Sequence, residues 1–133
     1  MNNMKLNEYQ QQLQICKMQI RTLEKLRKQQ ATIESQIKHT EVDIEKYEQD
    51  LKNARKKLDK LEGFSFVNLF RTWTGKQQEL LEERMDVIAT KELKLIEAQL
   101  MHEDLKDDLV DTIYKINAIN EPYLVDQIKQ FEN

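Results

Sequence analysis

The two histidines and the carboxylates are the side chains with which this chain could perform chemistry. Glutamine stands three residues before each of His39 and His102, so the Glu-x-x-His spacing of di-iron helical bundles is absent. The sequence also lacks a His-Glu-x-x-His motif, paired cysteines and a glycine-rich phosphate loop. We therefore expect no enzyme activity, no catalytic residues, no cofactor and no metal.

A cluster of carboxylates in the second half of the chain comprises Glu103, Asp104, Asp107, Asp108 and Asp111. These residues fall within a helical pattern and lack the glycine turn of a calcium-binding loop. We interpret them as a solvated helix face. We interpret the adjacent His102 as a polar residue inside a helix–helix seam.

The scarcity of helix breakers indicates the fold class. The 133 residues include two glycines and one proline, too few for the turns of a β-rich fold. A hydrophobic content of 39% and a charged content of 34% suit narrow helix–helix seams. The sequence predicts an all-α fold: a long antiparallel two-helix coiled-coil hairpin with a short aromatic helical tip.

Charge and hydropathy limit the partners and the location. A net charge of −3 gives no argument for a nucleic-acid partner. No apolar run approaches the ~18 residues that span a membrane. The first twelve residues lack the apolar stretch of a secretory signal. We expect a cytoplasmic protein, and the single Cys16 leaves this open because it can form no intrachain disulfide.

Apolar residues of the first half recur in steps of three and four, which indicates one narrow coiled-coil stripe. The steps from Ile20 to Leu23 to Leu26 are three and three, a stammer. The predicted seam consists of Leu6, Tyr9, Leu13, Cys16, Ile20, Leu23, Leu26, Gln30, Ile33, Ile37, Thr40, Ile44, Tyr47, Leu51, Ala54, Leu58 and Leu61.

The second half carries a matching seam, with a stutter where Leu105, Leu109 and Ile113 follow in steps of four. Pro122 interrupts it, and Asn120 can cap a restarted helix. We predict one domain over 1–133, with helices at 3–62 and 77–120, a tip at 63–76, and a short C-terminal helix or kinked continuation at 121–132. The predicted seam comprises Leu81, Met85, Ile88, Leu95, Ala98, His102, Leu105, Leu109, Ile113 and Ile116, and then Leu124, Ile128 and Phe131 share one face.

Charge blocks predict how the halves pair. If the chain turns near residue 70, facing residues have numbers that add up to about 139. The lysine-rich block 52–60 then faces the acidic block 79–86, Glu45 and Glu48 face Lys94 and Lys91, and basic residues at 21–28 lie beside Asp107–Asp111. Such pairs select register more than they stabilise.

The predicted tip, 63–76, contains three of the four phenylalanines and the only tryptophan. Ser65 can cap a short helix that Gly75 ends, which places the apolar residues on one face. This face either folds onto the end of the hairpin or docks a protein or a membrane surface. Membrane docking is the weaker version, because only Arg71 and Lys76 add local positive charge. The candidate partner-binding residues here are Phe64, Phe66, Leu69, Phe70 and Trp73.

A second apolar stripe runs along the second helix, and the first helix has no spare stripe to bury it. Self-association into a four-helix bundle as a homodimer, or a partner helix, would cover it. The alternative is that the folded-back residues 122–133 cover part of it. The candidate partner-binding residues are Ala89, Leu93, Ile96, Leu100, Val110 and Tyr114.

The turn sequence Trp73-Thr74-Gly75 resembles the W-x-G turn of the WXG100 family, helical hairpins of type VII secretion. That resemblance implies paired hairpins in a four-helix bundle. The family's export pattern, a tyrosine followed four residues later by an acid, is not matched at Tyr114 or Tyr123. This mismatch argues against an exported substrate and leaves a helper or targeting subunit as the alternative. The wider tip, with Leu-Glu-Gly-Phe-Ser followed by Leu69-Phe70 and Gly75-Lys76, also looks like uncharacterised bacterial coiled-coil proteins.

These observations predict a non-enzymatic protein–protein interaction or scaffolding module, whose partner is another protein or a second copy. Two alternatives stay open. One is an adaptor or targeting chaperone of a type VII-like secretion system, and the other is a membrane-surface protein that inserts its aromatic tip. The sequence does not identify the partner or the pathway, nor whether the tip is packed.

Overall fold

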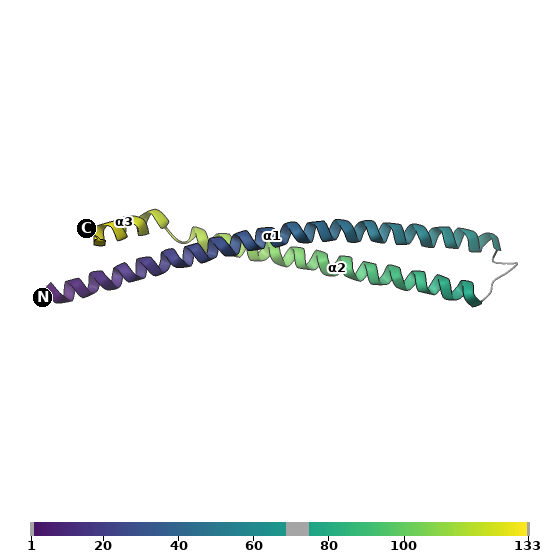
Figure 1. Ribbon diagram of the computed structural model, residues 1–133, viewed down its shortest axis with the longest axis horizontal. Helices are drawn as coiled ribbons and strands as arrows, with labels where there is room; N and C mark the ends of the chain where they lie inside the picture. Colours follow the sequence, from purple (N-terminus) through teal and green to yellow (C-terminus); the bar gives the residue numbers. More distant parts are fainter. Residues whose placement is uncertain (1, 69–74, 133) are drawn as a thin grey trace. The chain divides into compact units, whose positions relative to one another are not determined.

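The computed structural model describes the backbone of residues 2–68 and 75–132 and the side chains of residues 5–60 and 78–131 (Figure 1). Helix α1 spans Asn2–Asn68, α2 spans Gly75–Asn117 and α3 spans Glu121–Glu132. The described residues contain no strand. The prediction of an all-α antiparallel hairpin is confirmed.

The chain divides into two compact units. The first comprises Met1–Gln36 with Leu105–Asn133, and the second comprises Ile37–Asp104. Each unit contains an antiparallel pairing of α1 with the later part of the chain, so each has its own buried seam.

The seam of α1 follows the predicted periodicity. From residue 13 to residue 58, every predicted seam residue is buried or half-buried, including the polar Gln30 and Thr40. Leu6 and Tyr9 differ, because 56% and 53% of their surface is exposed. The last described side chain of α3, Phe131, lies against Tyr9, so the first turns of α1 extend to where α3 offers little to pack on.

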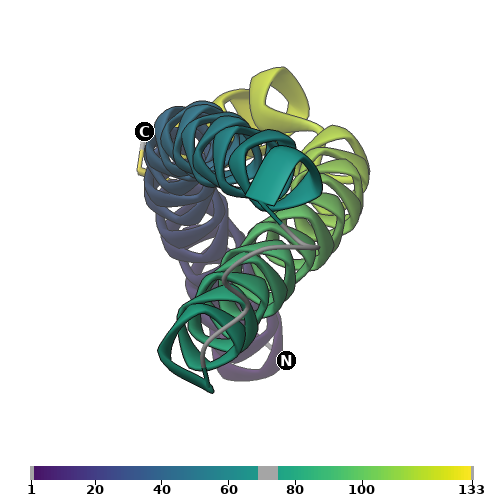
Figure 2. The same cartoon turned by 90° about the vertical axis from the view of Figure 1, so that its right-hand side faces the viewer.

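Polar contacts fix the antiparallel pairing in the second unit, whose helices can be followed end-on in Figure 2. Arg55 Nη2 lies 2.9 Å from Glu92 Oε1, and Lys91 Nζ lies 4.0 Å from Asp50 Oδ2. His102 Nε2 lies 3.2 Å from Glu41 Oε1, with only 14% of the histidine side chain exposed, which confirms its seam position. These are not the predicted pairs, because their residue numbers add up to 147, 141 and 143 rather than to about 139.

The seam of α2 differs from the prediction at Met85, which is 53% exposed while Arg84 is half-buried instead. Ile113 is half-buried as predicted, and its neighbour Thr112 is only 3% exposed. With Arg84, the half-buried Lys91 and Thr112 as seam residues, the steps from Leu81 to Ile116 alternate between three and four, which keeps one stripe facing the partner helix. The stutter stays a prediction, because Thr112 and Ile113 both lie at the seam.

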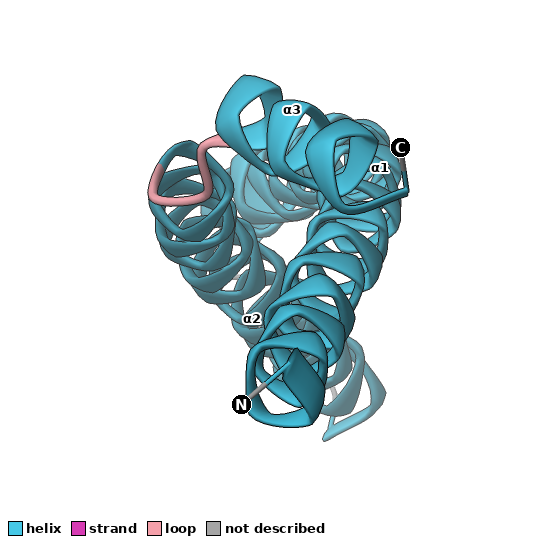
Figure 3. Cartoon of the chain, turned by 90° about the vertical axis from the view of Figure 1, so that its left-hand side faces the viewer, coloured by secondary structure: helices cyan, strands magenta, loops and turns pink. Residues whose placement is uncertain are grey.

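Helix α2 ends at Asn117, before the predicted residue 120, and a short loop leads to α3 (pink in Figure 3). The N–H of Tyr123 donates to Asn120 Oδ1 at 3.2 Å, so Asn120 caps α3 as predicted. Pro122 stands in the first turn of α3, where its missing N–H costs least. Leu124 is 3% exposed, and Ile128 and Phe131 are half-buried on the same face.

Helix α3 packs on α1 within the first unit. The ring centroids of Tyr9 and Phe131 are 5.7 Å apart at an interplanar angle of 44°. At the other end of α3, Arg27 binds Glu121. The stammer before Arg27 is retained, since Leu26 is half-buried and Arg27 is exposed, and it lies opposite the break between α2 and α3 rather than opposite a stutter.

The predicted tip is only partly described. Helix α1 continues through Gly63 to Asn68, beyond the predicted end at residue 62, and Gly75 is the first residue of α2. The predicted left-handed cap at Gly75 stays a prediction, because residues 69–74, where the tip helix would end, lie outside the described residues. The aromatic tip stays a prediction, because its side chains lie outside the described residues.

Candidate interaction surfaces

The outer face of α2 in the second unit presents a row of exposed apolar side chains. Leu93, Ile96 and Leu100 are 56%, 51% and 61% exposed, and Ala89 is exposed as well. At about 100° per residue, this row lies nearly opposite the seam residues Leu95 and His102. We call Ala89, Leu93, Ile96 and Leu100 the α2 stripe.

The α2 stripe is exposed because α1 offers a single apolar face. That face is already occupied by the seam of α2, and α1 in this unit has one large exposed apolar residue, Val42, among its described side chains. Full burial of a leucine or isoleucine contributes about 1.5–3 kcal/mol. A contiguous row of such residues is typical of a surface that binds another molecule.

The α2 stripe is bordered by carboxylates. At about 100° per residue, the half of the helix centred on the stripe carries no lysine or arginine between residues 82 and 104. The three basic residues of this segment, Arg84, Lys91 and Lys94, fall on the other half. We call the bordering set the acidic rim, which consists of Glu82, Asp86, Glu92, Glu97, Glu103 and Asp104.

Two further candidates, Val110 and Tyr114, lie in the first unit and are 68% and 75% exposed. Helix α3 packs on α1 and leaves both exposed, so the alternative that the C-terminal segment covers them is wrong. Sequence reasoning missed the exposed Ile15 and Met18, although the seam residues around them already placed them outside the seam.

The candidates of the tip, Phe64, Phe66, Leu69, Phe70 and Trp73, lie outside the described residues. The structure therefore gives the α2 stripe as the one candidate surface of the second unit with described geometry. Both alternatives for the tip, packing onto the end of the hairpin and docking a partner, stay predictions.

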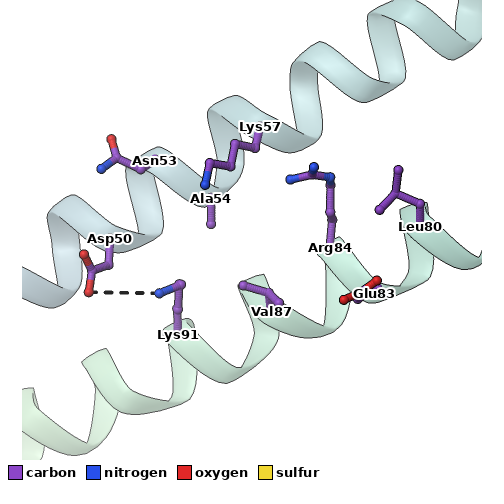
Figure 4. A pocket seen from close by; sticks show the side chains of 9 residues that line it. All are labelled: Asp50, Asn53, Ala54, Lys57, Leu80, Glu83, Arg84, Val87 and Lys91. Atoms are coloured by element: carbon purple, nitrogen blue, oxygen red, sulfur yellow. Dashed lines mark ion pairs between the residues drawn. The ribbon is translucent and has the colours of Figure 1, made fainter.

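A cavity of about 380 Å³ opens between α1 and α2 in the second unit (Figure 4). Ala54, Lys57 and Arg84 line it, and Glu83 lies on the same wall as Arg84. Lys57 and Glu83 belong to the charge blocks that we predicted to face each other, and both line this cavity. Nε of Arg84 is buried and has no hydrogen-bond partner among the described atoms.

The described residues contain no group of three or more metal-ligating side chains. His39 Nε2 lies 3.7 Å from Asp43 Oδ2 on its own helix, and His102 contacts Glu41 across the seam. The clearest electrostatic effect is at Glu121, whose pKa is lowered mainly by the hydrogen bonds from Arg27. The same contact raises the pKa of Arg27. These contacts lie within α1, between α1 and α2, and between α1 and α3.

Comparisons with known proteins found no matching family model, no similar curated protein and no similar solved structure. None of the described helices is both long enough and apolar enough to cross a membrane.

Proposed function

We propose that this chain is a non-enzymatic protein-interaction module that binds a partner, another protein or a second copy, through the α2 stripe. One observation supports the proposal: Leu93, Ile96 and Leu100 form an exposed apolar row on a helix whose opposite face is already packed. A partner helix that lies along this row would bury it and would add a third helix to the antiparallel pair.

The proposal explains why the two helices differ. Among the described side chains of the second unit, the outer face of α1 is polar apart from Val42, whereas the outer face of α2 carries an apolar row over three turns. A hairpin that served only as a spacer would need apolar residues in its seam alone. The stripe adds apolar surface outside this seam, which a partner would bury.

The test compares the full wild-type chain with Leu93→Glu/Leu100→Glu, which places two charges on the α2 stripe. The control is Val42→Glu/Met101→Glu, which adds the same charge at two exposed positions outside the stripe. Light scattering measures the mass relative to the chain mass of 16.0 kDa, and tagged chains capture partners from an extract of the source organism.

We expect wild type and control to retain the same protein, or the same dimer mass, and the stripe variant to lose it. A wild-type chain that stays at 16.0 kDa at high concentration and captures nothing that depends on the stripe would contradict the proposal.

A further inference from the structure

We infer that the occupant of the α2 stripe is a basic amphipathic helix rather than the same face of a second copy. This inference rests on the proposed function, because it assumes that the stripe is a docking surface. It goes further by naming the chemistry of the partner, and it follows from the charges that border the stripe.

The acidic rim gives the stripe one sign of charge. Six carboxylates and no basic residue lie on this half of α2 between residues 82 and 104. Glu82, Asp86, Glu97 and Asp104 are exposed, and no ion-pair partner for them is found within the described part of the chain. Charged residues beside a helix–helix seam set partner choice and orientation. Lysine or arginine on the partner is therefore favoured.

Two of the three basic residues of the same segment serve the hairpin itself. Lys91 lies on the inner side, 4.0 Å from Asp50, and Arg84 lines the cavity between the helices. The third, Lys94, is exposed and falls outside the half of the helix that is centred on the stripe. The carboxylate of Glu92 already forms a cross-helix ion pair with Arg55.

A second copy that presented the same face would be a poor occupant. Pairing two α2 stripes would bring one acidic rim against another, and like charges across such a seam disfavour the pairing. The outer face of α1 does not solve this within the second unit, because Val42 is its only large exposed apolar residue among the described side chains. Among the described side chains of this unit, no single face of a second copy therefore offers both basic charge and apolar surface.

The chemistry of the occupant follows from these two requirements. It needs apolar residues in steps of three and four to cover Leu93, Ile96 and Leu100, and lysine or arginine beside them to face the acidic rim. Such a helix would contact α2 over at least the three turns from Ala89 to Leu100.

The probe is a synthetic helix of four heptads, roughly 28 residues, with leucine at the two seam positions and lysine at the flanking positions. A matched peptide carries glutamate in place of lysine, and a third has the lysine peptide's composition in scrambled order. Binding to the full chain is measured by fluorescence anisotropy. We expect the lysine peptide to bind at least about tenfold more tightly than either of the others.

Three double variants separate the apolar contribution to binding from the electrostatic one. Leu93→Glu/Leu100→Glu should weaken the lysine peptide by about tenfold or more, and Val42→Glu/Met101→Glu should not. Glu97→Lys/Asp104→Lys should weaken the lysine peptide and strengthen the glutamate peptide. Raising the salt from about 0.1 M to about 1 M, which shortens the Debye length from about 10 Å to about 3 Å, should reduce the preference for lysine.

The outcomes separate this inference from the proposed function. Equal binding of the lysine and glutamate peptides would overturn the inference. A wild-type dimer would also overturn the inference if Leu93→Glu/Leu100→Glu dissociates it, because the occupant of the stripe would then be a second copy. In either case the stripe would still bind a partner and the proposed function would stand. If no peptide binds and neither a dimer nor a captured protein depends on the stripe, both fail.

Discussion

Arg27 of α1 and Glu121 of α3 form an ion pair with two contacts, between residues that are 94 positions apart in the sequence. Nη1 donates to Oε1 at 3.2 Å and Nη2 donates to Oε2 at 2.5 Å. Glu121 is the first residue of α3, so this contact attaches the start of the helix to α1. Because the carboxylate accepts both hydrogen bonds, the pKa of Glu121 is lowered.

The first prediction concerns the pH dependence of this contact. A carboxyl group with a lowered folded-state pKa stabilises the folded state above its ordinary pKa of 4.5, and the contribution is lost as the pH falls through the lower, folded value. A carbon-13 NMR titration of the Glu121 carboxyl should therefore show a midpoint below 4.5. Arg27→Gln should move this midpoint upward.

The control for this titration is Lys115→Gln, which removes a cation whose Nζ lies 3.0 Å from Asp111 within α2. It should leave the Glu121 midpoint unchanged. A midpoint that is the same in wild type and Arg27→Gln would mean that the ion pair does not form in solution.

The second prediction concerns the N-terminal cap of α3. Asn120→Ala removes the acceptor of the Tyr123 N–H and should cost about 1 kcal/mol of helix stability, whereas Asn120→Asp should cost less because aspartate also caps. Amide hydrogen exchange, read residue by residue, should show faster exchange in α3 and little change in the second unit. Equal exchange in wild type and Asn120→Ala would show that the cap contributes nothing.

Much of the fold followed from periodicity, because a seam that must stay buried repeats in steps of three and four. This repeat predicted the seam of α1 from Leu13 to Leu58. Asn120 and Pro122 predicted the capped C-terminal helix. The exposure of the α2 stripe was also predictable, since counting apolar faces showed that α1 had none to cover it. The binding role of the stripe stays a prediction.

The remaining features depend on side-chain reach and on competition between neighbours. Met85 and Ile113 are more apolar than Arg84 and Thr112, and composition alone favours them for the seam. The regular step places Arg84 there instead of Met85, and Thr112 beside the half-buried Ile113. The Thr112 hydroxyl donates to the Asp108 carbonyl at 2.8 Å. The ion pairs were missed for a similar reason, because Arg55 extends along the seam to Glu92.

The third prediction compares a seam residue with a stripe residue. Leu23 is 1% exposed, so Leu23→Ala should leave a cavity and lower the free energy of unfolding by about 2–5 kcal/mol. Leu100 is 61% exposed, so Leu100→Ala should change it by less than about 0.5 kcal/mol at low protein concentration. Urea denaturation followed by circular dichroism measures both. Similar losses in the two variants would contradict the assignment of seam and stripe.

The last prediction is that replacing Arg84 stabilises the hairpin. Its side chain enters the seam between Leu81 and Ile88, and its Nε is buried with no hydrogen-bond partner among the described atoms. An unsatisfied buried donor costs about 1–3 kcal/mol, and leucine at this position would remove the donor and extend the apolar seam. Because Arg84 is only half-buried, we expect Arg84→Leu to raise the free energy of unfolding in urea by about 1 kcal/mol.

Lys94→Leu is the matched control, because Lys94 is exposed on the same helix and its replacement should change stability by less than about 0.5 kcal/mol. Arg84→Gln separates the two causes of stabilisation. It shortens the side chain but keeps a polar group in the seam, so it should not stabilise the hairpin as leucine does. If Arg84→Leu is destabilising, then the guanidinium has a partner in solution, and the cavity beside Lys57 is where that partner would lie.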